Sequence, residues 1–435
     1  MSVPTIISRF QPLKTFFLQV LADVRREEWE KFDGHARHVQ ILLLSQTQPQ
    51  VSPFVYDRLQ KLRKDPLLPA LRELRIPACY VGDLRSSFMS LSPQLRLVEL
   101  HSDSIEFFLS FTPALVEEAP LLTHLILHTQ VNVNLERVSD LKQLCKLDLQ
   151  VPTWNLSELF IRKLGELERL SDLHVELNNE LGNRLRNKKP TRHILGTTND
   201  GYQKLQTLLI RGSAIAITQM MRAMSFASLL TLTLEFNTTD SWQEVLKTLV
   251  EKETHITTVS LHSYSVTIDC KFGWISPLLQ IQTLETLEID IQSSFIDNDE
   301  FFSLMSSLPN LKILSLPPLS PLTAQVLWQP SKLAPGLAEL KVSLFQSATP
   351  PSGMMEIKIP RRHAHLALRK LSIGSLYGNM QDGDVIHFAR LLYRAFPNLE
   401  IVEGFGPNTH DVDSWGRVDT FRMATEPGQP TFGER

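Results

Sequence analysis

The sequence predicts an α/β solenoid, in which parallel strands lie side by side in one sheet and helices cover the opposite face. Three observations predict this fold. An aliphatic phrase with the spacing i, i+3, i+5 occurs clearly twelve times along the 435 residues. Successive copies begin 22 to 35 residues apart, and most begin 24 to 28 apart. A proline stands two positions before the first aliphatic residue in six copies, counting a weaker one near the C-terminus. The twelve copies are Leu71-Leu74-Ile76, Leu95-Val98-Leu100, Leu122-Leu125-Leu127, Leu144-Leu147-Leu149, Leu170-Leu173-Val175, Leu205-Leu208-Ile210, Leu229-Leu232-Leu234, Ile256-Val259-Leu261, Leu284-Leu287-Ile289, Leu311-Leu314-Leu316, Leu337-Leu340-Val342 and Leu368-Leu371-Ile373.

Each copy predicts a strand, because alternate residues of a strand point to opposite faces of the sheet. In residues 122–128, we expect Leu125 and Leu127 to point into the core and the residues beside them to point away. Two weaker copies, Ala36-Val39-Ile41 and Leu399-Val402, extend the series toward both ends of the chain.

The prolines mark the entry into six of these strands. Proline cannot donate to a sheet ladder, and it biases the residue before it away from the helix conformation. It therefore suits the point where a returning helix gives way to a new strand. The six are Pro69, Pro93, Pro120, Pro309, Pro335 and Pro397.

The stretches between copies predict helices. Residues 241–244, Ser-Trp-Gln-Glu, form a capping-box signature, and Asp384 is placed to cap a later run with helical spacing. The stretches 104–118 and 297–308 have the same character. Strand followed by helix, repeated at this length, predicts parallel strands with the helices on the other face of the sheet.

The pattern resembles the leucine-rich repeat, with a unit length like that of the longer, helix-containing class exemplified by the ribonuclease inhibitor. The resemblance covers residues 36–402. Members carry Asn or Cys three residues past the third aliphatic position, and this chain has Cys79, Asn178 and Asn237 there but other residues in most copies. The resemblance implies a curved parallel sheet on the concave face, helices on the convex face and variable loops.

A narrower resemblance is to the repeat halves of F-box proteins of mushroom-forming (basidiomycete) fungi. It is carried by residues 29–39, 308–316, 396–399 and 413–418. In that family an F-box precedes the repeats and recruits a cullin-type ubiquitin ligase through an adaptor, while the repeats capture the substrate. Residues 1–24 show none of the marks of an F-box. We therefore expect the adaptor as a partner only if an F-box exists upstream.

The repeats also predict the domain organisation. We expect an N-terminal helical cap in residues 1–35, the solenoid in 36–402 and an irregular C-terminal tail in 403–435. A cap is needed because the end unit of a solenoid would otherwise expose its apolar edge.

The composition predicts where the protein resides and which classes of partner it binds. The formal net charge of −3 predicts no nucleic-acid or membrane partner. Three widely spaced cysteines do not suggest a disulfide framework, and we expect cytoplasmic or nuclear residence. The basic stretch 184–193 has two open interpretations, a nuclear import or anion contact and a solvated loop.

A partner should bind the concave face, on the residues interleaved between the aliphatic positions. The middle of this surface is mildly acidic, which favours a basic or polar protein segment as the ligand. The alternative is that these residues are only the polar face of a half-exposed sheet. The candidate partner-binding residues are Glu99, Asp148, His174, Glu176, Arg211, Glu235, Glu288 and Asp290.

Other kinds of site have weaker signals. His101, His124, His128 and His174 could approach one another on neighbouring strands, but no cysteine or carboxylate completes an obvious tetrahedral metal set, so we expect no metal. No catalytic or phosphate-loop motif occurs, so we expect no enzyme and no cofactor. The leading hypothesis is a monomeric interaction scaffold of the F-box type. The alternatives are a stand-alone inhibitor or sensor and, remotely, an enzyme on a solenoid.

Overall fold

The computed structural model describes most of the predicted strands and about half of the stretches between them. The described residues are 26–43, 65–76, 91–131, 133–152, 157–178, 201–237, 242–252, 255–263, 270–291, 294–317, 320, 322–327, 333–344, 365–374, 392 and 394–405. The basic stretch 184–193, Asp384 and residues 1–25 of the expected cap lie outside these ranges, as do residues 406–435 of the expected tail. The three domain limits therefore stay predictions.

The chain forms two compact units. The first comprises residues 1–205 and 223–225, and the second comprises residues 206–222 and 226–435. Within each unit the described strands of the main sheet pair in the order in which they occur along the chain, and these pairings are parallel.

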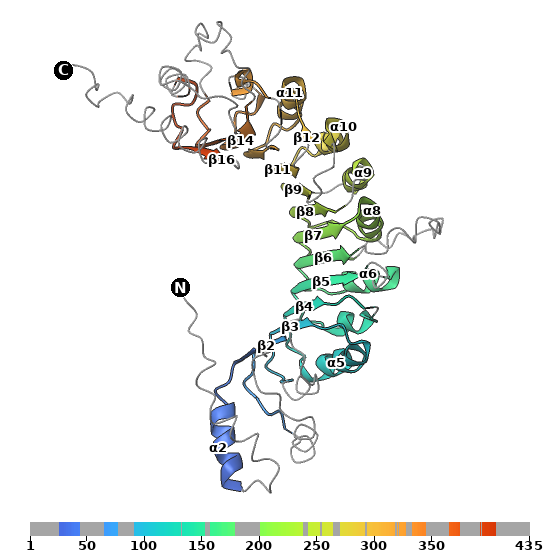
Figure 1. The fold of residues 1–435 in the computed structure, drawn as a ribbon. Coiled ribbons are helices and arrows are strands. Elements are labelled where there is room, and N and C mark those ends of the chain that lie inside the picture. Colours follow the sequence, from blue (N-terminus) through green and yellow to red (C-terminus); the bar gives the residue numbers. More distant parts are fainter. Residues whose placement is uncertain are drawn as a thin grey trace, which may run out of the picture. The chain divides into compact units, whose positions relative to one another are not determined.

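In the described part of the first unit, a helix precedes the sheet and helical segments lie between the later strands. Figure 1 shows α5 and α6 on the same side of the strands. The strands are β1 (Ile41–Leu43), β2 (Glu73–Ile76), β3 (Leu97–His101), β4 (His124–His128), β5 (Lys146–Pro152) and β6 (Asp172–Asn178). The helical segments are α2 (Arg26–Ala36), α5 (Ile105–Glu118), the 3-10 helix η2 (Glu136–Asp140) and α6 (Glu158–Gly165).

The second unit repeats this arrangement, with eight strands of the main sheet among its described residues. They are β7 (Thr207–Gly212), β8 (Thr231–Phe236), β9 (Thr258–Ser263), β11 (Thr286–Ile291), β13 (Ile313–Ser315), β14 (Glu339–Ser343), β15 (Lys370–Gly374) and β16 (Ile401–Phe405). The strands β10 (Cys270–Lys271) and β12 (Ser294–Phe295) form a separate pair. The helical segments are α8 (Ala214–Ala223), α9 (Gln243–Glu251), α10 (Phe272–Ile275), η4 (Ser276–Gln280), α11 (Asn298–Ser307) and η5 (Ala324–Leu327).

The aliphatic phrase forms the core of both units. Every residue of the twelve copies is at most 2% exposed. The residues between them in the strands are mostly half-buried, as the alternating burial of β3, β7 and β8 shows. The predicted strands and their core-facing positions are therefore confirmed in both units.

A recurring turn explains the prolines. The backbone N–H of Leu71 donates to the carbonyl of Leu68 at 3.0 Å, and Pro69 stands at the second position of this turn. Proline suits that position because its fixed φ matches the turn and its missing N–H is not needed there. The same bond, from the first aliphatic residue to the carbonyl three residues earlier, is made by Val39, Leu95, Leu122, Leu144, Leu170, Leu205, Leu229, Leu284, Leu311, Leu337 and Leu399.

Two of the predicted helix starts are confirmed, and a third, the capping box that begins at Ser241, lies partly outside the described residues. Ser104 caps α5, and Asp297 caps α11 in a capping box with Glu300. The helix α9 begins at Gln243 with Trp242 as its N-cap residue, which makes no side-chain cap bond, and Ser241 lies outside the described residues. Trp242 is fully buried, and its ring stacks on Phe236 at 4.0 Å between ring centroids, so packing sets this start.

The weak N-terminal copy was assigned to the wrong register. Leu42 of β1 pairs with Leu74 of β2, so Leu42 takes the middle aliphatic position and Val39 the first. Ile41, expected to be buried, is 44% exposed. The continuous aliphatic run around β1 fits several registers, and only the pairing with β2 selects one. The C-terminal weak copy was placed correctly, because Val402 is buried and pairs with Leu371.

Candidate partner-binding surface

The predicted surface residues of the first unit lie in two rows across its sheet. Parallel pairing places them side by side on successive strands, about 4.8 Å apart. The surface they form, on the side away from the buried aliphatic residues, is called the inner face of the unit. The central row is Arg75, Glu99, Ile126, Asp148 and His174, and the outward row is His101, His128, Gln150 and Glu176.

The second unit has two corresponding rows on its own inner face. Its central row is Leu209, Thr233, Ser260, Glu288, Ser315, Lys341, Ser372 and Glu403, and its outward row is Arg211, Glu235, His262 and Asp290. The register thus brings together the candidate residues predicted in each unit. Their role as a binding site remains a prediction.

A chain of polar contacts begins at the N-terminal side of the first inner face. The guanidinium of Arg75 lies 3.6 Å from the Glu99 carboxylate. The other oxygen of Glu99 contacts Nε2 of His101 at 3.1 Å. Nδ1 of His101 then contacts Nδ1 of His128, on the next strand, at 3.0 Å.

The chain continues to Asp148 and His174. Nε2 of His128 lies 3.8 Å from Oδ1 of Asp148, and Nδ1 of His174 lies 2.8 Å from Oδ2 of the same carboxylate. Burial acts to raise the pKa of Asp148, but the contacts with His128 and His174 outweigh it and hold that pKa well below its ordinary value. Asp148 is therefore ionised at neutral pH.

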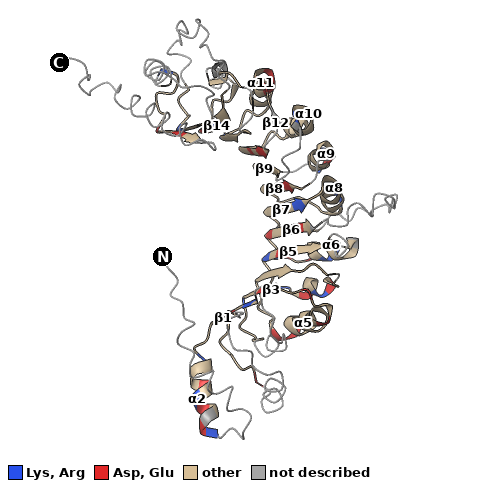
Figure 2. Ribbon diagram, in the orientation of Figure 1, with Lys and Arg blue, Asp and Glu red and all other residues tan. Residues whose placement is uncertain are grey.

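The polar contacts described on the second inner face are separate pairs. Arg211 lies 3.8 Å from Glu235, and Oγ of Ser260 donates to Glu288 at 3.0 Å. The side chain of Asp290 is 73% exposed, whereas that of Glu235 is 15% exposed. Figure 2 shows the basic part of β7 next to an acidic part of β8. Asp290 is therefore the more accessible of these two carboxylates.

Sequence reasoning missed Glu403, which ends the central row of the second unit. The hydroxyl of Ser372 donates to its carboxylate at 2.7 Å, and Lys370 lies 2.8 Å away. The hydrogen bonds from Lys370 and Ser372 lower the pKa of Glu403. Its signal was the weak copy at 399–402, which places residue 403 at the central position.

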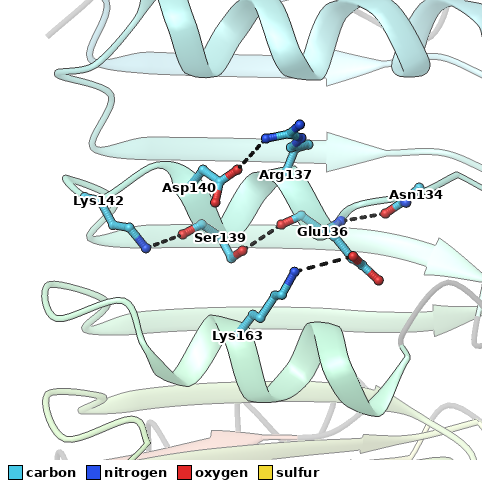
Figure 3. A network of polar contacts seen from close by, with 7 residues as sticks. All are labelled: Asn134, Glu136, Arg137, Ser139, Asp140, Lys142 and Lys163. Atoms are coloured by element: carbon cyan, nitrogen blue, oxygen red, sulfur yellow. Dashed lines mark hydrogen bonds and ion pairs between the residues drawn. The ribbon is translucent and has the colours of Figure 1, made fainter.

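The helical side of the first unit carries a local polar network. Figure 3 shows Lys163 of α6 contacting Glu136 of η2, at 3.4 Å between Nζ and Oε2. The remaining contacts stay within residues 134–142, including a 3.3 Å pair between Arg137 and Asp140. This network fixes η2 to α6.

The histidines do not form a metal centre in the described part of the chain. No group of three or more His, Cys, Asp or Glu side chains there could hold a metal ion. Nδ1 of His124 contacts the Thr123 hydroxyl at 2.9 Å and takes no part in the chain of contacts. Within the same residues, no helix is long and apolar enough to cross a membrane.

The strand-and-helix units, the buried aliphatic phrase and the parallel sheet define a leucine-rich-repeat solenoid of the α/β class. No protein-family model matches the chain, and no curated protein matches it.

Two solved structures are similar to this chain at low sequence identity. The structure of a TLR13–ssRNA13 complex has 17% sequence identity and a TM-score of 0.36, over 84% of this chain and 56% of that chain. This chain thus spans about half the length of that protein. The structure of a Rad7 and Elc1 complex in yeast has 14% identity and a TM-score of 0.36, over 100% of this chain and 99% of that chain.

Proposed function

We propose that this solenoid is a protein-interaction scaffold whose inner face binds a basic or polar segment of a partner protein. The observation that carries the proposal is the alignment of acidic side chains from separate repeats into rows. Glu235 and Asp290 share one row of the second unit, and Glu288 lies in the row beside it.

Such rows suit an extended cationic segment. Strand spacing of about 4.8 Å repeats the carboxylates along the sheet, and the partial exposure of their side chains leaves oxygens that a lysine or arginine can reach. Surface charges of one sign also steer an oppositely charged partner and contribute more to the association rate than to raw affinity.

The test is charge reversal on the second inner face. Oligolysine and oligoglutamate peptides serve as defined probes, with binding followed by fluorescence anisotropy. The double variant Glu235→Lys, Asp290→Lys should weaken oligolysine binding at least tenfold without lowering the melting temperature.

A matched control separates the face from the net charge. Glu117 and Glu118 are exposed residues in the last turn of α5. The double variant Glu117→Lys, Glu118→Lys makes the same change in net charge and should keep oligolysine binding. Equal weakening in both variants, or tighter binding of oligoglutamate than of oligolysine by the wild-type chain, contradicts the proposal.

The narrower proposal is that the solenoid is the substrate-recognition region of an F-box-type ubiquitin-ligase receptor. Its support is the resemblance carried by residues 29–39, 308–316, 396–399 and 413–418. The test is genomic sequence upstream of Met1 together with co-purification of the cullin adaptor. An in-frame F-box and recovery of the adaptor support the receptor. Stop codons in every frame and no adaptor favour the alternative, a stand-alone inhibitor or sensor.

A further inference from the structure

The pair of histidines at the centre of the first inner face has an unusual contact. His101 of β3 and His128 of β4 are register partners, and their rings meet edge to face with centroids 4.1 Å apart. Their Nδ1 atoms are 3.0 Å apart. At that distance one nitrogen must carry a proton and donate while the other accepts, so the contact needs one N–H.

The outer nitrogens of the pair each face a carboxylate. Nε2 of His101 lies 3.1 Å from Glu99, and because a carboxylate only accepts, this contact needs an N–H on His101. Nε2 of His128 faces Oδ1 of Asp148 at 3.8 Å. Both of these atoms are buried and lack a hydrogen-bond partner among the described residues.

The buried contact requires a proton of its own. If Nε2 of His128 carries no proton, two buried acceptors face each other, which leaves both unsatisfied and costs the desolvation of each. A ligand cannot approach these covered atoms. A proton on Nε2 of His128 turns the contact into a donor facing a carboxylate. The contact then closes toward hydrogen-bond distance at little cost.

The three contacts set the number of ring protons that the two histidines must carry. Three contacts need three N–H groups, whereas two neutral imidazoles carry only two. Two fully protonated rings carry four, and they would set N–H against N–H at 3.0 Å between His101 and His128. Only the pair with a single additional proton satisfies every contact. A proton on Asp148 would also serve the last contact, but the lowered pKa of that carboxyl opposes this arrangement.

We propose that His101 and His128 bind one shared excess proton, which links Glu99 to Asp148 in a continuous hydrogen-bonded chain and makes the first inner face a proton-regulated surface. Its consequence for binding rests on the proposed function. With the proton bound, this part of the face carries one negative charge fewer. Loss of the proton at higher pH should therefore strengthen the attraction for a cationic partner segment.

Charged groups surround the pair on every neighbouring strand. Arg75 of β2 pairs with Glu99 and offsets part of its charge. His174 of β6 occupies the second oxygen of Asp148, and Glu176 ends the outward row that contains the pair. Gln150, between His128 and Glu176 in that row, is neutral. The pair thus lies between two carboxylates, each with a cationic or titratable partner on its far side.

The test counts ring protons in the free, full-length chain. Histidine rings labelled with ¹⁵N are followed by NMR from pH 5 to 9, and His101→Gln and His128→Gln assign the signals. His124→Gln is the matched control, since His124 lies on β4 outside the chain of contacts. The expected result is a pH interval in which both Nε2 atoms carry a proton and one further proton is shared between the Nδ1 atoms. A direct change from four ring protons to two, with no interval of three, overturns the proposal.

The functional consequence has a separate readout. Oligolysine affinity should rise as the shared proton is lost in the wild-type chain, and this pH response should disappear in His101→Gln but persist in His124→Gln. A correct proton count without any oligolysine binding rejects the proposed function and keeps the shared proton. If the chain binds oligolysine while both histidine rings are neutral, the shared proton is rejected and the proposed function is kept.

Discussion

The backbone N–H of Leu368 donates to the Nδ1 atom of His365 at 3.2 Å. In the other described turns of this kind, the equivalent N–H donates to a backbone carbonyl. Nε2 of His365 contacts the carbonyl of Ala334 at 3.0 Å, so it must carry the proton. The buried His365 side chain therefore joins two consecutive repeats as a neutral ring with a fixed tautomer.

This tautomer predicts a pH-dependent stability. Burial lowers the pKa of His365 below its ordinary value and outweighs the backbone hydrogen bonds that act to raise it. Because the unfolded state then binds the proton more readily, the stabilisation is present above about pH 6.5 and is lost as the pH falls below that value. Urea unfolding at pH 7.5 and 5.5 should show that His365→Asn loses less free energy of unfolding between these two pH values than the wild-type chain does. His38→Asn, at an exposed histidine, should keep the wild-type loss.

The lowered pKa of Asp148 predicts a second loss of stability, at lower pH than the one caused by His365. Its pKa is lower in the folded state than in the unfolded state, where it is about 3.9. Its stabilisation is therefore present above that value and is lost as the pH falls toward the folded pKa. Asp148→Asn should cost about 1–3 kcal/mol at pH 7 and flatten the acid limb of the unfolding free energy below about pH 4. An unchanged acid limb contradicts this role.

Two leucines of one repeat test whether the aliphatic positions face the core. Leu232 is fully buried and Leu230 is 42% exposed. Leu232→Ala should cost about 2–5 kcal/mol in the free energy of unfolding, through lost transfer free energy and a cavity. Leu230→Ala removes the same atoms and should cost less than about 1 kcal/mol. Equal costs would show that the aliphatic phrase does not face the core.

Substitution by alanine should have opposite effects on stability at two glycines that lie in helices. A Cβ on Gly165 would lie 3.0 Å from the Tyr202 ring and 3.1 Å from Cα of Gly201, whereas one on Gly34 would meet nothing within 4 Å. The Tyr202 hydroxyl donates to the carbonyl of Ile161, which holds the ring in place. Gly165→Ala should cost about 1–3 kcal/mol, and Gly34→Ala should stabilise by about 0.5–1 kcal/mol. Thermal unfolding of both variants checks the two signs.

Much of the fold was predictable because its signals are local and repeated. The spacing of the aliphatic positions sets the strands, and equal spacing in successive copies sets the rows that contain Glu99, Glu235 and Asp290. The run around Ile41 was misplaced because uninterrupted aliphatic residues fit several registers, which only pairing with β2 distinguishes.

Side-chain relationships within the site could not be predicted in the same way. The sequence placed His101 and His128 near each other, but not their Nδ1 contact, which depends on rotamers and on the surrounding carboxylates. The stacking of Trp242, the residue before α9, on Phe236 is likewise a tertiary contact with no local signature.

Carboxyl footprinting tests the central claim most directly. The full-length chain is labelled with a carbodiimide and glycine ethyl ester, with and without bound oligolysine, and peptides are quantified by mass spectrometry. The account predicts that oligolysine protects Glu235, Glu288 and Asp290 and leaves Glu117 and Glu118 fully labelled. Protection of Glu117 and Glu118, with the inner-face carboxylates still labelled, would contradict it.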